Sequence, residues 1–314
     1  MTHMIKKIFL ILLVCFSNKI HSQIISEKLI EKHLLTLADD FMEGRRAGSK
    51  GIELAAKYIE SEFERIGLTK FDTLSSFRQN FTAREMSLYN IIGVLKGKSK
   101  ANEYVIISAH YDHLGVKTGN DEDLIFNGAN DNASGVTAVL ALAEHYKALD
   151  LNERSILFVT FTAEEMGLIG SNYFGKQILP KQVIAGINIE MIGKESPFGP
   201  KTAWITGFDR SNFGQIIQKN LLNSNYSVYA DPYVDYRLFF RSDNASLARL
   251  GVPAHTFSTS PMDKDLDYHK VSDESTTLDL FTVSETIKAI ATGILSIIKG
   301  EDSPSRIVME KDSS

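Results

Sequence analysis

The sequence predicts one α/β domain with a mixed, largely parallel β-sheet and helices on both faces. Strand-like and helical segments alternate along most of the chain, which is the order that builds a parallel sheet from β-α-β units. The run Ser155–Thr162 is continuously β-branched and aromatic, as in central strands that are covered on both faces. No internal repeat, linker or low-complexity segment divides the sequence, so we expect a single domain from about residue 24 to residue 300.

Helices are predicted where apolar residues recur every three to four positions. The first predicted helix begins at Ser26, a residue type that caps helix N-termini, and ends near Asp40. A second covers residues 50–66 and stops at Gly67, since glycine readily adopts the left-handed conformation that ends helices. The remaining predicted helices are Ser134–Leu149, which is strongly apolar, Gly167–Lys176, Ser211–Leu222 and one long closing helix, Asp279–Lys299.

Strands are predicted where β-branched and aromatic residues gather between turn residues. The segment Phe41–Gly48 carries glycines and two arginines and is predicted to be a loop. Residues 301–314 follow the closing helix and are predicted to form a mobile tail. The predicted strands are Leu88–Leu95, Tyr104–Ser108, Ser155–Thr162, Val183–Ile192, Thr202–Thr206, the neighbourhood of Val228, and Ala254–Phe257.

The first 22 residues have the pattern of a secretory signal peptide. Lys6 and Lys7 precede an unbroken apolar run, Ile8–Phe16, and a short polar stretch that ends at Ser22. The apolar run is too short to cross a bilayer, which needs about 20 residues. We therefore expect a secreted or periplasmic protein that is not stably inserted in the membrane after cleavage of the signal peptide.

Composition excludes several classes of function. The only cysteine, Cys15, lies inside the predicted signal peptide, and Val14 before it is larger than the small residue that lipid-attachment sites prefer, which argues against a lipid anchor. The mature chain would then have no disulfide, no thiolate metal ligand and no cysteine nucleophile. Removing Lys6, Lys7 and Lys19 from the 34 basic residues leaves 31 against 39 acidic ones, a net charge of −8. No Lys/Arg cluster remains, which argues against a nucleic-acid partner.

Imidazole and carboxylate side chains gather at the ends of the predicted strands. His110 follows one strand-like run, Glu164 and Glu165 follow another, and Glu190 lies at the end of a third. Because ligands of open α/β sheets bind beyond the carboxyl ends of the strands, we expect these residues to meet at one edge of the sheet. Asp131 lies in a turn rich in Asn and Gly just before a helix, and by itself it would be interpreted as a helix cap. Because Asp131 is expected to lie beside His110, we interpret it as a metal ligand and not as a helix cap.

The spacing of these residues also suits metal chemistry. In an extended segment the side chains of His110 and Asp112 lie on the same side, so one can bind a metal while the other accepts a hydrogen bond from the far ring nitrogen. The adjacent carboxylates of Glu164 and Glu165 point different ways, so one can bind a metal while its neighbour holds a water molecule. Two like charges placed together are costly unless a cation offsets them.

These segments together resemble peptidase family M28, the zinc-dependent exopeptidases that include co-catalytic aminopeptidases and have glutaminyl cyclases and glutamate carboxypeptidases as relatives. Weaker similarity extends to Gly44-Arg45, Tyr58–Gly67 and Asn90–Gly93, so the resemblance covers nearly the whole mature chain in order. The resemblance also implies a phosphorylase/hydrolase-like fold. The matching segments are Ala109–Gly115, Gly128–Gly135, Glu164–Ser171, Asn188–Gly193, Arg241–Asp243 and Tyr268-His269.

The resemblance implies a site for two zinc ions. Asp131 would bridge the metals, Glu165 and His269 would complete the shell of one metal, and His110 and Glu190 would complete the shell of the other. His269 stands in a polar loop, where an isolated histidine is usually only solvated, and its position in the family order is what makes it a candidate ligand. The substrate would be a peptide from which N-terminal residues are removed.

The resemblance gives Glu164 the role of general base and acid, and gives Asp112 the role of orienting His110. Family members most often have Asp where Glu190 stands, and the longer side chain would shift the second metal or weaken its binding. Many relatives have histidine where Asn244 stands, which affects the expected substrate contacts. The Glu190 substitution keeps open a glutaminyl cyclase-like acyltransferase with one zinc, and a non-catalytic binding module on the same fold is a third hypothesis.

Two features near the predicted site receive no functional role from the sequence. His113 lies close to His110 in the chain and is left unassigned. The loop Asp231–Arg241 is expected to help build the substrate pocket, although packing is the expected role of its aromatic residues, Tyr233, Tyr236, Phe239 and Phe240.

Overall fold

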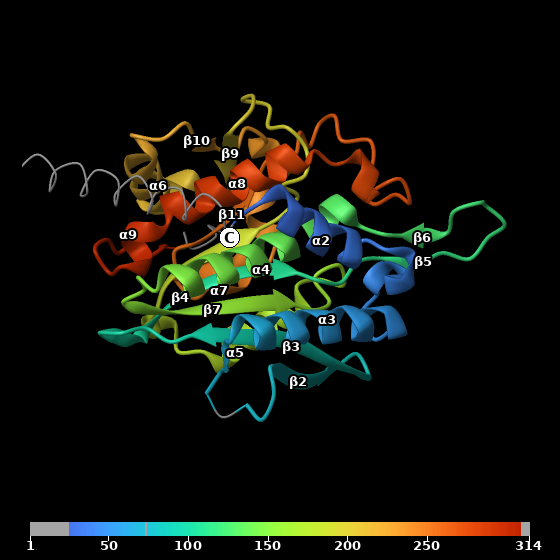
Figure 1. The fold of residues 1–314 in the computed structure, drawn as a ribbon, viewed down its shortest axis with the longest axis horizontal. Helices are drawn as coiled ribbons and strands as arrows, with labels where there is room; N and C mark the ends of the chain where they lie inside the picture. The colour runs from blue at the N-terminus through green and yellow to red at the C-terminus, as the bar shows by residue number, and fades with distance from the viewer. Residues whose placement is uncertain (1–24, 73, 309–314) are drawn as a thin grey trace, which may run out of the picture.

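A nine-stranded mixed sheet forms the centre of the protein (Figure 1). The computed structural model describes residues 25–72 and 74–308, and the predicted signal peptide lies outside the described residues. The strands lie in the order β1-β3-β7-β4-β8-β11-β9-β10, and β2 also pairs with β3. Their bounds are β1 (Thr69–Lys70), β2 (Arg78–Ala83), β3 (Met86–Leu95), β4 (Lys100–His110), β7 (Arg154–Phe161), β8 (Val183–Ile189), β9 (Thr202–Ile205), β10 (Ser227–Ala230) and β11 (Ala254–Ser258).

The four central strands of the sheet run parallel to one another. Strand β4 pairs in parallel with β7 on one side and with β8 on the other, and β8 pairs in parallel with β11. The flanking strands β3 and β9 are antiparallel to β7 and β11. In this register Ser108 of β4 lies opposite both Val159 of β7 and Asn188 of β8. The carboxyl ends of β4, β7 and β8 therefore meet at one edge, as predicted.

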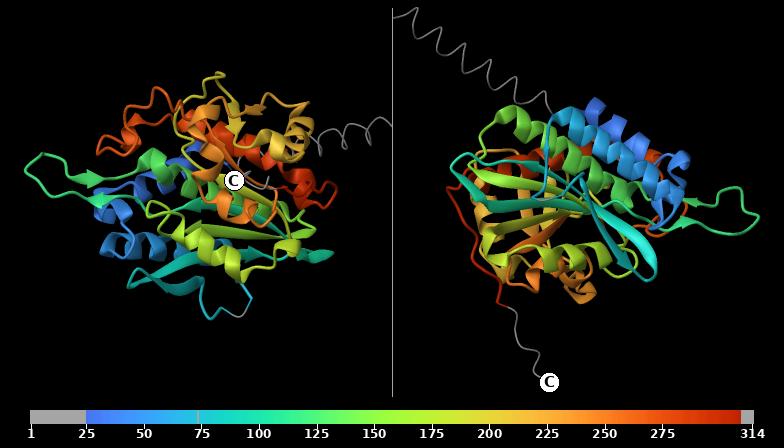
Figure 2. Two further views of the ribbon diagram at one scale, coloured as in Figure 1. Left: turned by 180° about the vertical axis from the view of Figure 1, so that it is seen from behind. Right: turned by 90° about the horizontal axis from the view of Figure 1, so that it is seen from below.

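Helices cover both faces of the sheet (Figures 1 and 2). On one face, α4 packs on β4 and β7 and contacts α2, α3 and α8. On the opposite face, α5 contacts β3 and α7 contacts β8 and β11. Helix α6 packs beside α8. The bounds are α2 (Glu27–Leu37), α3 (Lys50–Ile66), α4 (Ser134–Leu149), α5 (Ile169–Gln177), α6 (Phe213–Leu221), α7 (Asn244–Ala248), α8 (Leu280–Gly293) and α9 (Leu295–Ile298).

The alternation of side chains along β4 explains why two apolar layers form. Val105 and Ile107 point into the larger core beneath α4, whereas Ile106 between them belongs to a second core on the opposite face. All eight residues of β7 are buried, which is the behaviour expected of a strand covered on both faces. The prediction of a single α/β domain with a largely parallel sheet is confirmed.

Local signals placed the first two helices correctly. The hydroxyl of Ser26 accepts a hydrogen bond from the backbone N–H of Leu29 and caps α2. Gly67 is left-handed, with φ of 79°, and its N–H donates to the last carbonyls of α3. The segment predicted to be a loop after α2 forms a short 3₁₀ turn, Asp40–Arg45.

The structure corrects the prediction for the end of the chain. The closing helix divides into α8 and α9 at Ile294 instead of running unbroken from Asp279 to Lys299. Residues 301–308 are not a free tail. Arg154 donates a 2.6 Å hydrogen bond to the carbonyl oxygen of Asp302, and Ile307 is buried and donates its N–H to Gly251. Residues 309–314 lie outside the described residues.

Several elements were not predicted, among them the strands β1, β2, β5 and β6 and the short helix α7. Strand β2 pairs along its whole length with β3, and the hairpin of β5 (Gly115–Val116) and β6 (Ile125–Phe126) projects from the domain (Figure 1). None of the described helices is both long enough and apolar enough to cross a membrane.

Candidate metal centre

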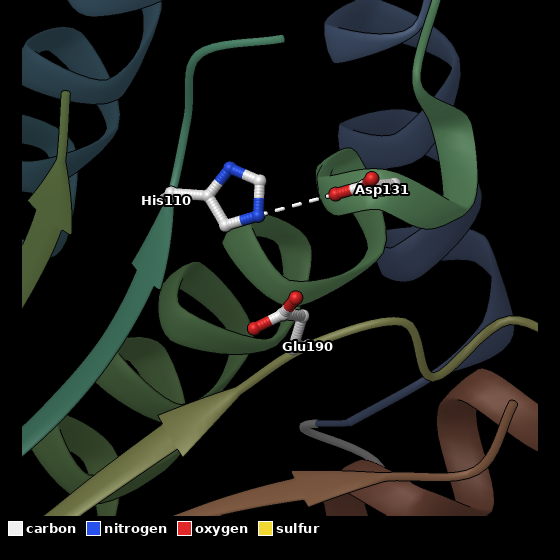
Figure 3. A group of neighbouring side chains, drawn as sticks. All are labelled: His110, Asp131 and Glu190. Carbon is white, nitrogen blue, oxygen red and sulfur yellow. Dashed lines mark ion pairs between the residues drawn. The ribbon is translucent and has the colours of Figure 1, made fainter. Parts of the chain in front are cut away.

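The predicted site residues meet beyond the carboxyl ends of the parallel strands. His110 is the last residue of β4, Glu190 directly follows β8, and Glu164 follows β7 after a short bend. Figure 3 shows His110 and Glu190 extending from neighbouring strands toward Asp131, which lies in the turn before α4. Residues that are up to 80 positions apart in the chain are thus brought together by the parallel pairing of β4 with both of its neighbours.

The turn that carries Asp131 depends on its Asn and Gly residues. Gly128 is left-handed, with φ of 54°, and a Cβ at this position would overlap the carbonyl oxygen of Asp131. The side chain of Asn132 donates to the carbonyl of Ile189 at 3.0 Å and accepts from the N–H of Gly135 at 2.9 Å. The peptide bond between Asp131 and Asn132 is cis. The hydrogen bond from Asn132 to Ile189 fixes the turn to the end of β8, next to Glu190.

A second carboxylate holds the backbone of this turn. Asp273 accepts hydrogen bonds from the backbone N–H groups of Asn130 and Asp131, at 2.8 and 3.0 Å. Asp273 follows His269 in the same loop, so this contact also fixes the loop of His269 beside the turn. Asp273 received no role in the sequence analysis, because no local pattern shows which backbone groups a loop carboxylate will cap.

Arg45 anchors the loops beneath the site. Its guanidinium is fully buried and donates to four backbone carbonyls, of Leu37, Tyr111, Asn127 and Gly128, at 2.5 to 3.0 Å. Tyr111 follows His110, and Gly128 begins the turn of Asp131. One side chain therefore connects the two segments that carry these predicted ligands.

His110, Asp131 and Glu190 form the first group that could hold a metal. One ligand atom from each lies within 4.8 Å of the others. The Nε2 atom of His110 is 3.2 Å from Oδ1 of Asp131 (Figure 3). In the described part of the chain, Nε2 of His110, Oδ1 of Asp131 and Oε2 of Glu190 are buried without a hydrogen-bond partner. Buried polar atoms are rarely left unpaired, so three such atoms within one group of candidate ligands fit a cation well.

His113, Asp131 and Glu165 form a second group that could hold a metal, and His269 approaches the same two carboxylates. Nε2 of His269 lies 3.2 Å from Oδ2 of Asp131 and 3.1 Å from Oε2 of Glu165. Nδ1 of His113 lies 2.8 Å from Oε1 of Glu165 and 4.0 Å from Oδ2 of Asp131. Tetrahedral zinc with bonds of about 2.0–2.1 Å separates its ligand atoms by about 3.3 Å. The His269 distances match this spacing, whereas the shorter His113 distance is that of a hydrogen bond.

His113 is the residue near the metal site that the sequence left unassigned. It is fully buried, and its ring stands edge-on to that of His269, with centroids 5.8 Å apart. Its hydrogen bond to Glu165 would fix the orientation of that carboxylate, as residues next to metal ligands commonly do. Its place three residues after His110 was a weak signal, because the partner is 52 positions away.

The position of Asp112 was predicted correctly but its hydrogen bond was not. The Nδ1 atom of His110 lies 3.1 Å from the backbone carbonyl of Asp112 and 3.9 Å from its carboxylate. The carboxylate accepts instead from the backbone N–H groups of Glu164 and Glu165, at 3.0 and 3.3 Å. The predicted bond between this carboxylate and His110 does not form, because two N–H groups beyond β7 take up its oxygens.

Burial and mutual repulsion make three carboxyl groups of the site hard to ionise, those of Glu164, Glu190 and Asp243. Burial, together with the charges of Glu190 and Asp243, raises the pKa of Glu164 well above its usual range. Burial likewise raises the pKa of Glu190 and of Asp243 to about 7. The sequence assigned no role to Asp243, which is fully buried and adds negative charge next to Glu164.

The histidines partly compensate this negative charge. Although burial opposes ionisation, Glu164, Asp131 and Glu190 raise the pKa of His110 well above its usual range. Against the same opposing effect, Asp131 and Glu165 raise the pKa of His269 to about 10. A site that gathers this many carboxylates and draws protons onto its imidazoles favours a divalent cation, which would occupy the same positions as those protons.

The site opens into a cavity of about 430 Å³. Phe240 and Arg241 line this cavity, which confirms that the loop Asp231–Arg241 contributes to it, whereas Phe239 is buried in the second core. A smaller cavity of about 40 Å³ adjoins Glu190 and is lined by both apolar and polar side chains, among them Met191, Trp204 and Arg241. The site residues that line the larger cavity are Asp131, Glu164, Glu165, Glu190 and His269.

Comparison with known proteins agrees with this geometry. The alkaline phosphatase isozyme conversion protein of Escherichia coli (strain K12) is 31% identical over 157 residues, which cover 47% of this chain and 44% of that protein. Aminopeptidase YwaD of Bacillus subtilis (strain 168) is 33% identical over 108 residues, which cover 33% of this chain and 22% of that protein. The chain thus spans less than half the length of either relative.

The fold agrees with that of a solved zinc aminopeptidase, BSAP from Bacillus subtilis. The TM-score is 0.70 with 14% sequence identity, over 91% of this chain and 98% of that one. A model of peptidase family M28 matches residues 90–294, a segment that contains every predicted metal ligand. Because this match extends over well more than half of the sequence, the chain belongs to peptidase family M28.

Proposed function

We propose that this protein is a zinc-dependent aminopeptidase that hydrolyses N-terminal residues from peptides. The observation that carries the proposal is the position of Asp131, whose two carboxylate oxygens face different histidines. Oδ1 lies 3.2 Å from Nε2 of His110, and Oδ2 lies 3.2 Å from Nε2 of His269. This is the arrangement that a carboxylate bridging two metal ions requires. We assign His110 and Glu190 to one zinc and Glu165 and His269 to the other.

Zinc ions at these positions would polarise the scissile carbonyl and make water more acidic. The other steps belong to side chains of this protein. Glu164 lines the cavity beside the ligands, and its raised pKa suits a group that accepts a proton from the attacking water and delivers it to the leaving amine. The Asp112 carboxylate fixes the backbone of Glu164, so the base is held in place by its main chain.

Removal of an N-terminal residue is supported by the charge of the cavity. Glu164 lines the cavity beside the proposed metal ligands and is itself not assigned to a metal, so its carboxylate favours a substrate with a free, positively charged α-amino group near the scissile bond. The pattern of the first 22 residues supports a secreted or periplasmic location, which we include in the proposal.

The proposal is tested by assaying the mature protein on aminoacyl-anilides and on a peptide with N-terminal glutamine, before and after chelation. We expect anilide hydrolysis that chelation abolishes and zinc restores. Ammonia release from the glutaminyl peptide with a blocked N-terminus, without anilide hydrolysis, would contradict the peptidase and favour the cyclase. Bound zinc without turnover of either substrate would favour a binding module.

A further inference from the structure

Two arginines line the same cavity as the predicted metal ligands. Arg241 follows a turn formed by Leu238–Phe240, and Arg249 follows the last residue of α7. Phe240, which also lines the cavity, lies 6.0 Å from the guanidinium of Arg249, and this contact places the guanidinium over its ring. The cavity therefore combines a carboxylate-rich metal centre with two cationic side chains.

Neither arginine forms an ion pair with a carboxylate in residues 25–72 and 74–308. Other arginines of this protein do so. Arg78 binds Glu53 and Glu60, and Arg154 binds Glu103 at 2.6 Å. A guanidinium is a planar donor that matches a carboxylate with two parallel hydrogen bonds. Two unpaired guanidiniums in a substrate cavity are thus suited to bind a carboxylate of the substrate.

The size of the cavity limits where that carboxylate lies in the substrate. At about 430 Å³ the cavity is within the range of small-molecule sites, roughly 300 to 1,000 Å³. A space of this size suits a small ligand such as a short peptide. If the α-amino group and the scissile carbonyl lie at Glu164 and the metal ligands, the residue after the scissile bond is the one that can reach Arg241 and Arg249.

We propose that Arg241 and Arg249 bind a carboxylate carried by the residue after the scissile bond, so that this protein prefers dipeptides and other short acidic substrates. The inference rests on the proposed aminopeptidase function and adds the class of substrate. The carboxylate has two sources with the same chemistry, namely the free C-terminus of a dipeptide or the side chain of Asp or Glu at that position.

The test uses the zinc-loaded protein and four substrates that share one N-terminal residue, Leu. Leu-Gly is compared with Leu-Gly-amide, which lacks the C-terminal charge, and Leu-Glu-amide is compared with Leu-Gln-amide, which lacks the side-chain charge. We expect one of the two ratios of kcat/KM to favour the charged substrate by roughly ten- to hundredfold, chiefly through a lower KM. The first ratio identifies the C-terminal carboxylate, and the second identifies the side chain.

Variants connect the preference to the two arginines. In the double variant Arg241→Gln/Arg249→Gln the favoured ratio should fall to near one, and Arg241→Lys should retain part of it. Arg237→Gln is the matched control, because Arg237 is exposed in the same loop and does not line the cavity. The control makes the same kind of substitution at one position outside the cavity, so it should leave the ratio unchanged.

Each result is decisive. Ratios near one for both substrate pairs in the unmodified protein would overturn the inference and leave the aminopeptidase function intact. A preference that survives in the double variant, or that is lost equally in Arg237→Gln, would also overturn it. Failure to hydrolyse any of the four substrates or an anilide in the presence of zinc would instead contradict the proposed function itself.

Discussion

Replacing Arg45 with methionine should weaken both the fold and the metal site. The guanidinium is fully buried and donates to four carbonyls in three segments, namely the end of α2, the residue after His110, and two consecutive residues before Asp131. Methionine has a similar length but no donor, so all four carbonyls would lose this partner in a buried position.

The magnitude follows from the same contacts. Hydrogen bonds from a charged donor contribute about 1.5 to 3 kcal/mol each. Against this gain stands the cost of burying the charge, which is reflected in a pKa of Arg45 lowered to about 10 by burial, in spite of the opposing charges of Asp273 and Asp112. We expect a net loss of about 3 to 5 kcal/mol in the free energy of unfolding, as for other buried charged groups whose partners are left unpaired.

The assay measures unfolding of the metal-free protein in guanidinium chloride and zinc affinity by competition with a chelator. Arg45→Met should also weaken zinc binding by about ten- to hundredfold, since the support of two ligand-bearing segments is lost. Arg46→Met is the matched control, because Arg46 is adjacent and exposed, and its replacement should change stability by less than about 0.5 kcal/mol. A loss below about 1 kcal/mol for Arg45→Met, or unchanged zinc affinity, would refute the reasoning.

Three further predictions concern the base, the second histidine and acid stability. Glu164→Gln should retain zinc but reduce kcat by about 10² to 10⁴, and near-normal turnover would contradict its role as base. His113→Gln should leave the fold intact but weaken zinc binding by about tenfold or more through Glu165, as measured by chelator competition; unchanged affinity would refute this. Burial lowers the pKa of His33 and His255 from 6.5 to about 4 in the folded protein. The unfolded chain therefore binds protons more readily than the folded protein between pH 6.5 and pH 4, and the free energy of unfolding should fall over this range. The expected decrease at pH 5 is about 2 kcal/mol per histidine. Chemical denaturation at pH 7 and pH 5 should show that the free energy of unfolding falls less in His255→Gln than in the wild type. An equal decrease in both proteins would show that His255 does not contribute.

Elements with local signals were predictable from the sequence. The bounds of α3 agree with the structure because Ser49 caps its start and Gly67 ends it. Strand β7 was recognised because a strand buried on both faces leaves a continuous apolar run. The convergence of His110, Glu164 and Glu190 followed from a general property of parallel sheets, namely that the carboxyl ends of the strands share one edge.

Features that depend on distant contacts were not predictable. The Asp112 carboxylate was expected to serve His110 nearby, but it binds N–H groups 52 and 53 positions away. The closing helix was expected to be continuous, but Gly293 at the end of α8 packs closely against Ile217 of α6, and the helix breaks at the next residue. Such contacts are decided by packing between segments, which leaves no period or cap in the sequence.

The residue at position 190 shows what a family pattern leaves open. Glu190 has one methylene more than the aspartate expected there, and its Oε2 atom is nevertheless buried next to His110 and Asp131 without a hydrogen-bond partner in the described residues. The longer side chain therefore still reaches the first group of ligands. Glu190 is therefore placed where the two-zinc site implied by the family resemblance requires a ligand, and the number of zinc ions stays a prediction.

The bridging role of Asp131 is the central claim, and it is tested most directly by the zinc content of the purified chain. The protein should be stripped of metal, dialysed against buffered zinc and analysed by elemental mass spectrometry. We predict two zinc ions per chain in the wild type and in Asp209→Asn, an exposed control, and the loss of tight binding at both positions in Asp131→Asn. Binding of at most one zinc by the wild type, or of two zinc ions by Asp131→Asn, would contradict the claim.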